Sequence, residues 1–254
     1  MLDFSIRLAT KAGDYLKDNL EGEITIEHKG RIDLVTNMDR LSQERIVSEI
    51  ERAYPDHGIL AEEGFSKKGT SAFTWVIDPI DGTNNFIHRI PFFCVAVAVL
   101  KDGEPLVGVC RNPVSDETFW AQAGRGAFKN GAPIRVSQTR RMIDSLIATG
   151  FPYDHDDMAS LLGRFERVLR KARGIRRMGS AALDLCMVAS GSLDGFWEQG
   201  LKPWDMAAGV VILREAGGAV TCLDGSPFDL ERGDIVASNA RVHEELQGCM
   251  RDDR

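Results

Sequence analysis

The sequence predicts a mixed α+β fold in which an antiparallel sheet is followed by a layered α/β part. In the middle of the chain, β-rich runs between residues 92 and 136 are joined by Asp-Gly and Asn-Gly dipeptides, which are typical of tight hairpin turns. From residue 145 onward, short apolar runs alternate with helical patterns, which favours packed layers of strands and helices. No linker-like stretch divides the 254 residues, so we expect one compact unit with an antiparallel half, 1–140, and an α/β half, 141–254.

The first elements follow from the spacing of apolar residues. Apolar positions recur at helical intervals in residues 3–20 and 39–54, and Pro55 ends the second predicted helix. Apolar runs at 58–60 and 75–77 predict strands, and acidic residues follow each of them. The predicted hairpin strands are residues 92–100, 106–110, 117–122 and 132–136.

The second half contains the predicted α/β layers. We expect a strand at 145–149 and helices at 157–172, 180–189 and 206–216. The last of these helices is apolar nearly all round and ends in Gly217-Gly218, which is typical of a helix buried between layers. Short strands at 219–223 and 235–238 and a helix from residue 240 complete the prediction.

Composition excludes several classes of protein. The 31 basic and 38 acidic side chains give a net charge of −7, which opposes direct binding to nucleic acid through phosphate contacts. No uncharged apolar run approaches the ~18 residues of a membrane span. The start of the chain lacks the pattern of a secretory signal, so we expect a cytoplasmic protein. The five cysteines form no Cys-x-x-Cys pair and indicate reduced core residues.

Common site signatures are also missing from the sequence. There is no Gly-Lys dipeptide and hence no Walker loop, and neither His-Glu-x-x-His nor Gly-x-Ser-x-Gly occurs. The five histidines do not cluster at the spacing of metal ligands, which argues against zinc hydrolysis.

The stretch Asp78-Pro79-Ile80-Asp81-Gly82-Thr83 ends a predicted strand in acid. Two ionised carboxylates ~4 Å apart repel by about 4 kcal/mol at an effective dielectric of 20, and a divalent cation between them reverses the sign. Oxygen ligands suit Mg²⁺, and the Ile80 carbonyl can turn toward the same ion. Gly82 permits close approach, and a helix start at Thr83 favours a phosphate. An ordinary capped turn is equally compatible with this stretch.

Acids at two other element ends favour the metal site. Glu62 follows the strand at 58–60, and Asp205 lies where the buried helix begins. A solvated glutamate pair and a helix N-cap are the alternative interpretations of these two positions.

Taken together, these residues resemble the inositol monophosphatase family. The resemblance rests on a set of blocks in a common order: Asp33-Leu34-Val35-Thr36 with Asp39, Ala61-Glu62-Glu63, Asp78-Pro79-Ile80-Asp81-Gly82-Thr83 with Asn85-Phe86 and Pro91-Phe92, Gly179-Ser180-Ala181-Ala182, Trp204-Asp205 with Ala207-Ala208-Gly209, and Glu215-Ala216-Gly217-Gly218. It covers nearly the whole chain.

The resemblance implies a five-layered αβαβα sandwich of the inositol monophosphatase and fructose-1,6-bisphosphatase type. It also implies Mg²⁺-dependent hydrolysis of inositol 1-phosphate by direct attack of a metal-activated water, with two or three ions in each site. Lithium sensitivity and a homodimer are further implications of the family.

Residue roles follow from the same resemblance. The ligands of a first metal are matched by Glu62, Asp78 and the Ile80 carbonyl. Those of a second metal are matched by Asp78, Asp81 and Asp205. A third ion would share Glu62. Gly82 and Thr83 match the phosphate contacts. Asp39 matches the carboxylate that binds the threonine hydroxyl, so Glu62, Thr83 and Asp39 are the expected catalytic residues. Asp39 has a second interpretation, as a helix N-cap before Leu41. Lys29 and Asp33 can also be interpreted as residues that form ion pairs on the surface.

The resemblance also suggests the substrate. Asp81, Gly179, Ser180, Ala181 and Glu198 would line the pocket for the ring hydroxyls, with Glu198 the most selective; a solvated strand end is the alternative for Glu198. Lys202, Arg176 and Arg177 add positive charge, so a second phosphate is compatible. The alternative functions are a broader sugar phosphatase acting on fructose 1,6-bisphosphate, a histidinol-phosphate phosphatase, and a regulatory binding protein.

Overall fold

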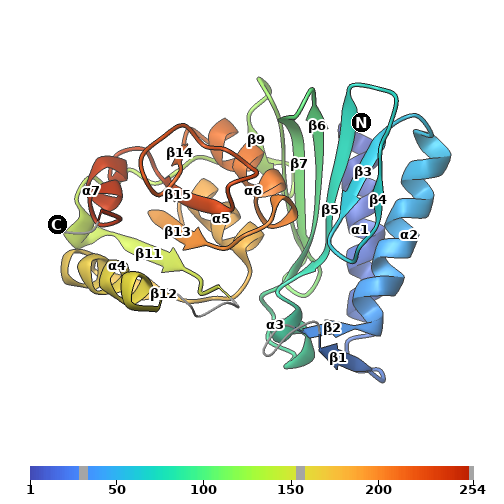
Figure 1. The fold of residues 1–254 in the computed structure, drawn as a ribbon, viewed down its shortest axis with the longest axis horizontal. Helices are drawn as coiled ribbons and strands as arrows, with labels where there is room; N and C mark the ends of the chain where they lie inside the picture. Colours follow the sequence, from blue (N-terminus) through green and yellow to red (C-terminus); the bar gives the residue numbers. More distant parts are fainter. Residues whose placement is uncertain (29–33, 153–157, 252–254) are drawn as a thin grey trace.

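Five layers follow one another across the molecule, as Figure 1 shows. The structure, a computed structural model, describes residues 1–28, 34–152 and 158–251. Helices α1 (Leu2–Asp18) and α2 (Asn37–Ala53) cover an eight-stranded sheet, whose other face packs against α5 (Ala181–Ala189) and α6 (Pro203–Glu215). A five-stranded sheet follows, covered by α4 (Met158–Lys171) and α7 (His243–Gly248). The expected αβαβα sandwich is therefore confirmed.

The eight-stranded sheet has the strand order β10-β9-β8-β7-β6-β5-β3-β4. All neighbouring pairs are antiparallel except β3 and β5, which are parallel, so the carboxyl ends of these two strands meet at one edge. The strands are β3 (Gly58–Ala61), β4 (Ser66–Lys67), β5 (Phe73–Asp81), β6 (Cys94–Lys101), β7 (Glu104–Asn112), β8 (Glu117–Gln122), β9 (Ala127–Lys129) and β10 (Ala132–Pro133).

Alternation along the central strand β6 divides the core between the two faces of this sheet. Val95, Val97 and Val99 pack toward α1 and α2, while Ala96 and Ala98 pack toward α5 and α6. Small residues on the second face let the middle helices lie close to the sheet. Helix α6 is buried along most of its length, as its all-round apolar sequence predicts.

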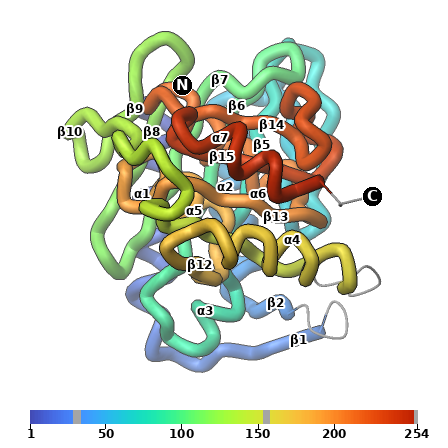
Figure 2. Tube along the Cα trace, turned by 90° about the vertical axis from the view of Figure 1, so that its left-hand side faces the viewer, coloured from blue at the N-terminus to red at the C-terminus, as the bar shows by residue number. Residues whose placement is uncertain are grey.

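The five-stranded sheet has the order β12-β11-β13-β15-β14. Strand β11 runs parallel to β12 and β13, and the other pairs are antiparallel. The strands are β11 (Leu146–Thr149), β12 (Gly174–Arg176), β13 (Gly195–Gln199), β14 (Ala219–Thr221) and β15 (Asp234–Ser238). Figure 2, viewed from this side, shows α4 and α7 on the outer face of the sheet.

Several short elements were not predicted. Strands β1 (Ile26–His28) and β2 (Leu34–Thr36) form a small separate sheet, and η1 (Met142–Asp144) precedes β11. Helix α7 begins at residue 243 rather than 240, and the expected start of α4 at residue 157 lies outside the described residues. Within the described parts of the chain, no helix has the length and apolar character that crossing a bilayer requires.

Candidate active site

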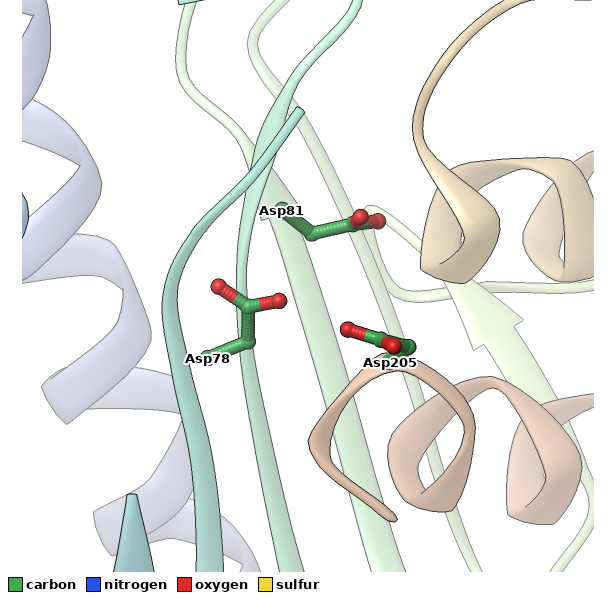
Figure 3. Close-up of side chains that lie close together, drawn as sticks. All are labelled: Asp78, Asp81 and Asp205. Atoms are coloured by element: carbon green, nitrogen blue, oxygen red, sulfur yellow. The ribbon is translucent and has the colours of Figure 1, made fainter. Parts of the chain in front are cut away.

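Three aspartates converge between the eight-stranded sheet and the middle helices. Asp78 and Asp81 come from the end of β5, and Asp205 comes from the first turn of α6. One carboxylate oxygen from each lies within 4.8 Å of the others, and Figure 3 shows the three side chains pointing toward a common space. The pairing of β5 with β6 is irregular between Asp78 and Asp81, where Pro79 has no N–H for the ladder. The predicted acidic strand end is thus a local break in the sheet.

Burial makes this group of acids electrostatically unfavourable without a cation. It raises the pKa of the Asp78 carboxyl well above its usual range, and the charges of Glu62, Asp81 and Asp205 raise it further. The pKa of Asp205 is also raised well above its usual range, first by burial and then by the charge of Asp81. Oxygen donors whose mutual repulsion is relieved by a divalent ion fit Mg²⁺ and similar hard cations.

Asp81 is held by the start of helix α5. Its Oδ2 accepts a hydrogen bond from the Ser180 hydroxyl (2.5 Å) and another from the Ala182 N–H (2.7 Å), while the Ala181 N–H lies 3.3 Å from Oδ1. Burial raises the pKa of Asp81 to about 6, although these donors lower it. Ser180 and Ala181, expected at the substrate pocket, therefore also orient a predicted metal ligand.

Asp205 is not the N-cap of α6, which is one interpretation of the sequence. Lys202 occupies the cap position, Pro203 begins the helix, and the Lys202 N–H donates to Asp205 Oδ2 at 2.7 Å. One oxygen is therefore used to hold the helix start, and Asp205 still contributes to the group of three acids.

Glu62 lies just beyond β3, next to the end of β5. The Glu62 N–H donates to the Ile77 carbonyl at 3.2 Å, which places the residue beside the aspartates. A cavity of about 230 Å³ is lined by the predicted metal and phosphate residues Glu62, Asp78, Ile80, Asp81, Gly82, Thr83 and Asp205, together with Gly200, Lys202 and Trp204. The structure thus brings together every residue that the resemblance assigns to the metals.

Thr83 lines this cavity and contacts Asp39 of helix α2. The Thr83 hydroxyl is 3.0 Å from Asp39 Oδ1 and 3.0 Å from the Ile80 carbonyl oxygen. Asp39 Oδ2 also accepts hydrogen bonds from the Thr36 N–H at 2.7 Å and from its hydroxyl at 2.6 Å. Thr36 is the N-cap of α2 in a capping box, so the N-cap interpretation of Asp39 is wrong. Burial raises the pKa of Asp39 to about 6.

Gly82 precedes the short helix α3 (Thr83–Ile87), which confirms the predicted helix start. Its φ of +98° favours glycine, and an added Cβ would lie 3.1 Å from the Gly179 carbonyl oxygen and 3.2 Å from that of Phe92. A side chain at residue 82 would therefore crowd the backbone at Phe92 and Gly179.

The predicted substrate residues line a second cavity, of about 90 Å³. It shares Asp81, Gly82, Gly200 and Asp205 with the first cavity, and its lining includes Gly150, Arg177, Gly179, Ser180, Ala181 and Glu198. Glu198 is not a solvated strand end, because it is only partly exposed and lines this cavity together with Arg177. Burial raises the pKa of its carboxyl to about 8, against the lowering effect of Arg177. A Cβ on Gly150 would lie 2.0 Å from the Glu198 carboxylate, so a glycine here leaves room for the acid.

The basic residues expected near the pocket lie in different places. Arg177 lines the second cavity and Lys202 the first, while Arg176 is exposed at the end of β12. Lys29 and Asp33 lie outside the described residues.

Asn85 and Asp184 are polar residues of the site region that had no role in the sequence-based interpretation. The buried Asn85 side chain donates to the Phe92 carbonyl at 2.6 Å and to the Met178 carbonyl at 2.8 Å, which joins α3 to the segment before α5. Asp184 is 1% exposed, and burial and then the charge of Glu198 raise its pKa well above the usual range. An acid inside the otherwise apolar helix at 180–189 is the sequence signal for Asp184.

Comparisons with known proteins identify the family. The profile of the inositol monophosphatase family matches residues 1–252. The chain belongs to the inositol monophosphatase family. An inositol-1-monophosphatase from Synechocystis sp. is 48% identical over 228 residues, which are 89% of this chain and 79% of that protein. The Nus factor SuhB of Escherichia coli K12 is 41% identical over 257 residues, 100% of this chain and 96% of that protein.

Two solved structures share the fold of this chain. The extragenic suppressor protein suhB from Bartonella henselae has a TM-score of 0.96 at 39% identity, covering 99% of this chain and 98% of that one. The inositol monophosphatase from Anabaena (Nostoc) sp. has a TM-score of 0.88 at 40% identity, covering 98% and 94% of the two chains.

Proposed function

We propose that this member of the inositol monophosphatase family is a Mg²⁺-dependent phosphomonoesterase that hydrolyses inositol 1-phosphate. The observation that carries the proposal is the group formed by Asp78, Asp81 and Asp205, whose oxygens lie within 4.8 Å of one another. This group lies in a cavity with Thr83, next to a pocket that contains Glu198.

The donor set fits hard divalent cations. Glu62, Asp78 and the Ile80 carbonyl would hold one Mg²⁺, and Asp78, Asp81 and Asp205 would hold a second, with a weaker third ion sharing Glu62. When bound, such ions stabilise the charge that develops on phosphate oxygens and lower the pKa of water.

The protein's own groups would orient the attacking water. Thr83 donates its hydroxyl proton to Asp39 or to the Ile80 carbonyl, so its oxygen lone pairs are free to accept a hydrogen bond from water. Glu62, which lines the same cavity, would accept a hydrogen bond from the second proton of that water, as an orienting group or as a base. The reaction needs mainly such positioning and electrostatic stabilisation.

The phosphate would lie at Gly82 and Thr83. The first intrahelical hydrogen bond of α3 runs from the Phe86 N–H to the Gly82 carbonyl, so the amides before Phe86 point out of the helix start. These N–H groups are suitable donors to phosphate oxygens.

The second cavity would hold the polyol part of the substrate. Glu198 can accept hydrogen bonds from two vicinal hydroxyls, and Asp81, Gly179, Ser180 and Ala181 would complete the lining. Arg177 in this cavity supports a second candidate substrate, fructose 1,6-bisphosphate, whose second phosphate it would contact.

Residues 1–254 would act as one catalytic unit. Residues 1–140 supply most of the proposed metal ligands, and 141–254 add Asp205 and the substrate pocket. We also propose a cytoplasmic, lithium-sensitive homodimer, as the family resemblance implies. Sedimentation velocity and inhibition by LiCl would test the last two properties.

The proposal predicts Mg²⁺-dependent phosphate release that is fastest with inositol 1-phosphate. The wild-type protein and the Asp81→Asn variant should be assayed on inositol 1-phosphate, fructose 1,6-bisphosphate and histidinol phosphate, with Mg²⁺ and with EDTA. We expect the variant to lose activity by a factor of at least about 100, because it removes a charge that a metal site requires. Activity that persists in EDTA or in the variant would mean that the acids form a structural turn.

A regulatory role is the second candidate function, because relatives that match over the whole chain are named Nus factor SuhB. A partner protein rather than nucleic acid would suit the net charge of −7. If the Asp81→Asn protein restored growth to a strain that lacks the wild-type protein, the cellular role would not depend on hydrolysis.

A further inference from the structure

Gln43 joins helix α2 to the turn that carries Glu62. It is only 6% exposed, and its Oε1 accepts a hydrogen bond from the Glu63 N–H at 2.8 Å. Its Nε2 donates to the Glu63 carbonyl oxygen at 3.3 Å. Both polar atoms of the side chain are therefore used on the backbone of the residue that follows Glu62.

This turn has a second restraint on the side of the sheet. The Glu62 N–H donates to the Ile77 carbonyl of β5 at 3.2 Å. The Ala61 N–H donates to the Phe65 carbonyl at 2.9 Å, and Gly64 in between has a φ of +78°. Glu62 thus lies between one backbone attachment to β5 and one attachment to α2 through Gln43.

The register of α2 relates this contact to Asp39, which contacts Thr83. Gln43 follows Asp39 by four residues, so both side chains lie on the same face of the helix. Asp39 contacts Thr83, and Gln43 contacts the backbone next to Glu62. One helix face therefore sets the separation of the two groups that would hold the attacking water.

We propose that Gln43 is a positioning residue that fixes the Glu62 carboxylate for metal binding. The inference rests on the proposed function, in that Glu62 is a ligand of a divalent cation. Groups that orient metal ligands typically contribute a factor of about 10 to 100 in metal affinity. Because Gln43 acts through a backbone segment, we expect the lower end of that range.

The test is a double-mutant cycle on Mg²⁺ affinity. Isothermal titration calorimetry would measure Mg²⁺ binding to the wild-type protein and to the Gln43→Met, Glu62→Gln and double variants. Methionine keeps the length of the side chain and removes both hydrogen bonds. Gln43→Met should weaken Mg²⁺ binding about tenfold when Glu62 is present and less than twofold when it is replaced, because the coupling passes through Glu62.

Gln247→Met is the matched control. Gln247 is a buried glutamine of α7 that donates to the Leu223 carbonyl at 2.6 Å, away from the cavity. It should lower the melting temperature in EDTA and leave Mg²⁺ affinity unchanged. If Gln43→Met does not fold, Gln43→Leu, which also removes both hydrogen bonds and adds no charge, replaces it in the same cycle.

Two results would overturn the inference. One is an unchanged Mg²⁺ affinity in the folded Gln43 variant, and the other is an equal loss with and without Glu62, which would make Gln43 a purely structural residue. Failure of the proposed metal site would be visible separately, since the wild-type protein would then bind no Mg²⁺, and both ideas would fall.

Discussion

Glu198 differs from the solvated strand end that is the alternative interpretation of its position in the sequence. Its carboxyl is enclosed beside Gly150, and burial raises its pKa to about 8, with Arg177 as the neighbouring cation. Below pH 4.5 the side chain is neutral in the folded and unfolded states. Between pH 4.5 and 8 the unfolded chain loses its proton first, so the folded protein loses stability as the pH rises.

Replacing Glu198 with glutamine should remove this loss. The measured quantity is the free energy of unfolding of Glu198→Gln minus that of the wild-type protein, both in EDTA. This difference should increase between pH 5 and pH 8.5 by on the order of 4 kcal/mol, since each pKa unit corresponds to about 1.4 kcal/mol. Urea unfolding at the two pH values measures it. A difference that stays constant with pH would contradict the raised pKa.

At the residue scale, the sequence could predict acids that lie together in a turn but not the groups that hold them. Asp78, Asp81 and Asp205 are recognisable because each ends or begins an element. Gln43 and Asp184 were missed because their partners lie elsewhere in the chain, and only tertiary packing brings Gln43 to Glu63.

The contact between α6 and β7 illustrates the scale of whole elements. Gly108 of β7 faces α6 so closely that an added Cβ would lie 2.2 Å from the carbonyl oxygen of Ala208 and 3.0 Å from its Cα. Because both contacts are with backbone, the helix itself would have to move. Asp205 begins the same helix, so this contact also determines where a proposed metal ligand lies.

The Gly108→Ala variant should therefore lose both stability and Mg²⁺ affinity. Overpacking of this kind costs about 1–3 kcal/mol or more, measurable by urea unfolding in EDTA. Gly248→Ala is a suitable control, since an added Cβ meets nothing within 4 Å at the end of α7. Equal stability of the two variants would show that α6 adjusts without cost.

Element prediction succeeded where the pattern was long and periodic. The turns at residues 101–104 and 130–131 agree with the structure, because turn dipeptides are local signals. The buried helix is present but begins at Pro203 rather than at residue 206, and the strand before the second turn is β9 rather than the predicted strand at 117–122. Strands β1, β2, β9 and β12, each of three residues, were missed because so short a segment carries no measurable period.

At the scale of the whole molecule, the acidic group joins two layers. Asp78 and Asp81 belong to the eight-stranded sheet, and Asp205 belongs to the middle helix layer (Figures 1 and 3). A cation that binds all three would link these layers in the folded state alone. The order of the five layers came from the family resemblance, since periodicity predicts faces of elements but not which elements face each other.

Mg²⁺ should consequently stabilise the complete fold. At a concentration of 100 times the dissociation constant, the gain is about 2.7 kcal/mol, which corresponds to a rise of roughly 5–10 °C in melting temperature for a chain of this size. Differential scanning calorimetry with Mg²⁺ and with EDTA measures the rise. The Asp205→Asn variant should lose most of it, and an undiminished rise in that variant would exclude Asp205 as a ligand.

The distance in sequence between Asp81 and Asp205 has a consequence for synthesis on the ribosome. Glu62, Asp78 and Asp81 leave the exit tunnel more than 120 residues before Asp205 does. At about 5–20 residues per second, the first acids wait roughly 6–25 seconds for the last ligand. For most of that interval neither α5 nor α6, the middle helices that cover one face of the eight-stranded sheet, has been synthesised. Assembly of the cation site would therefore be a late event in the maturation of the nascent chain.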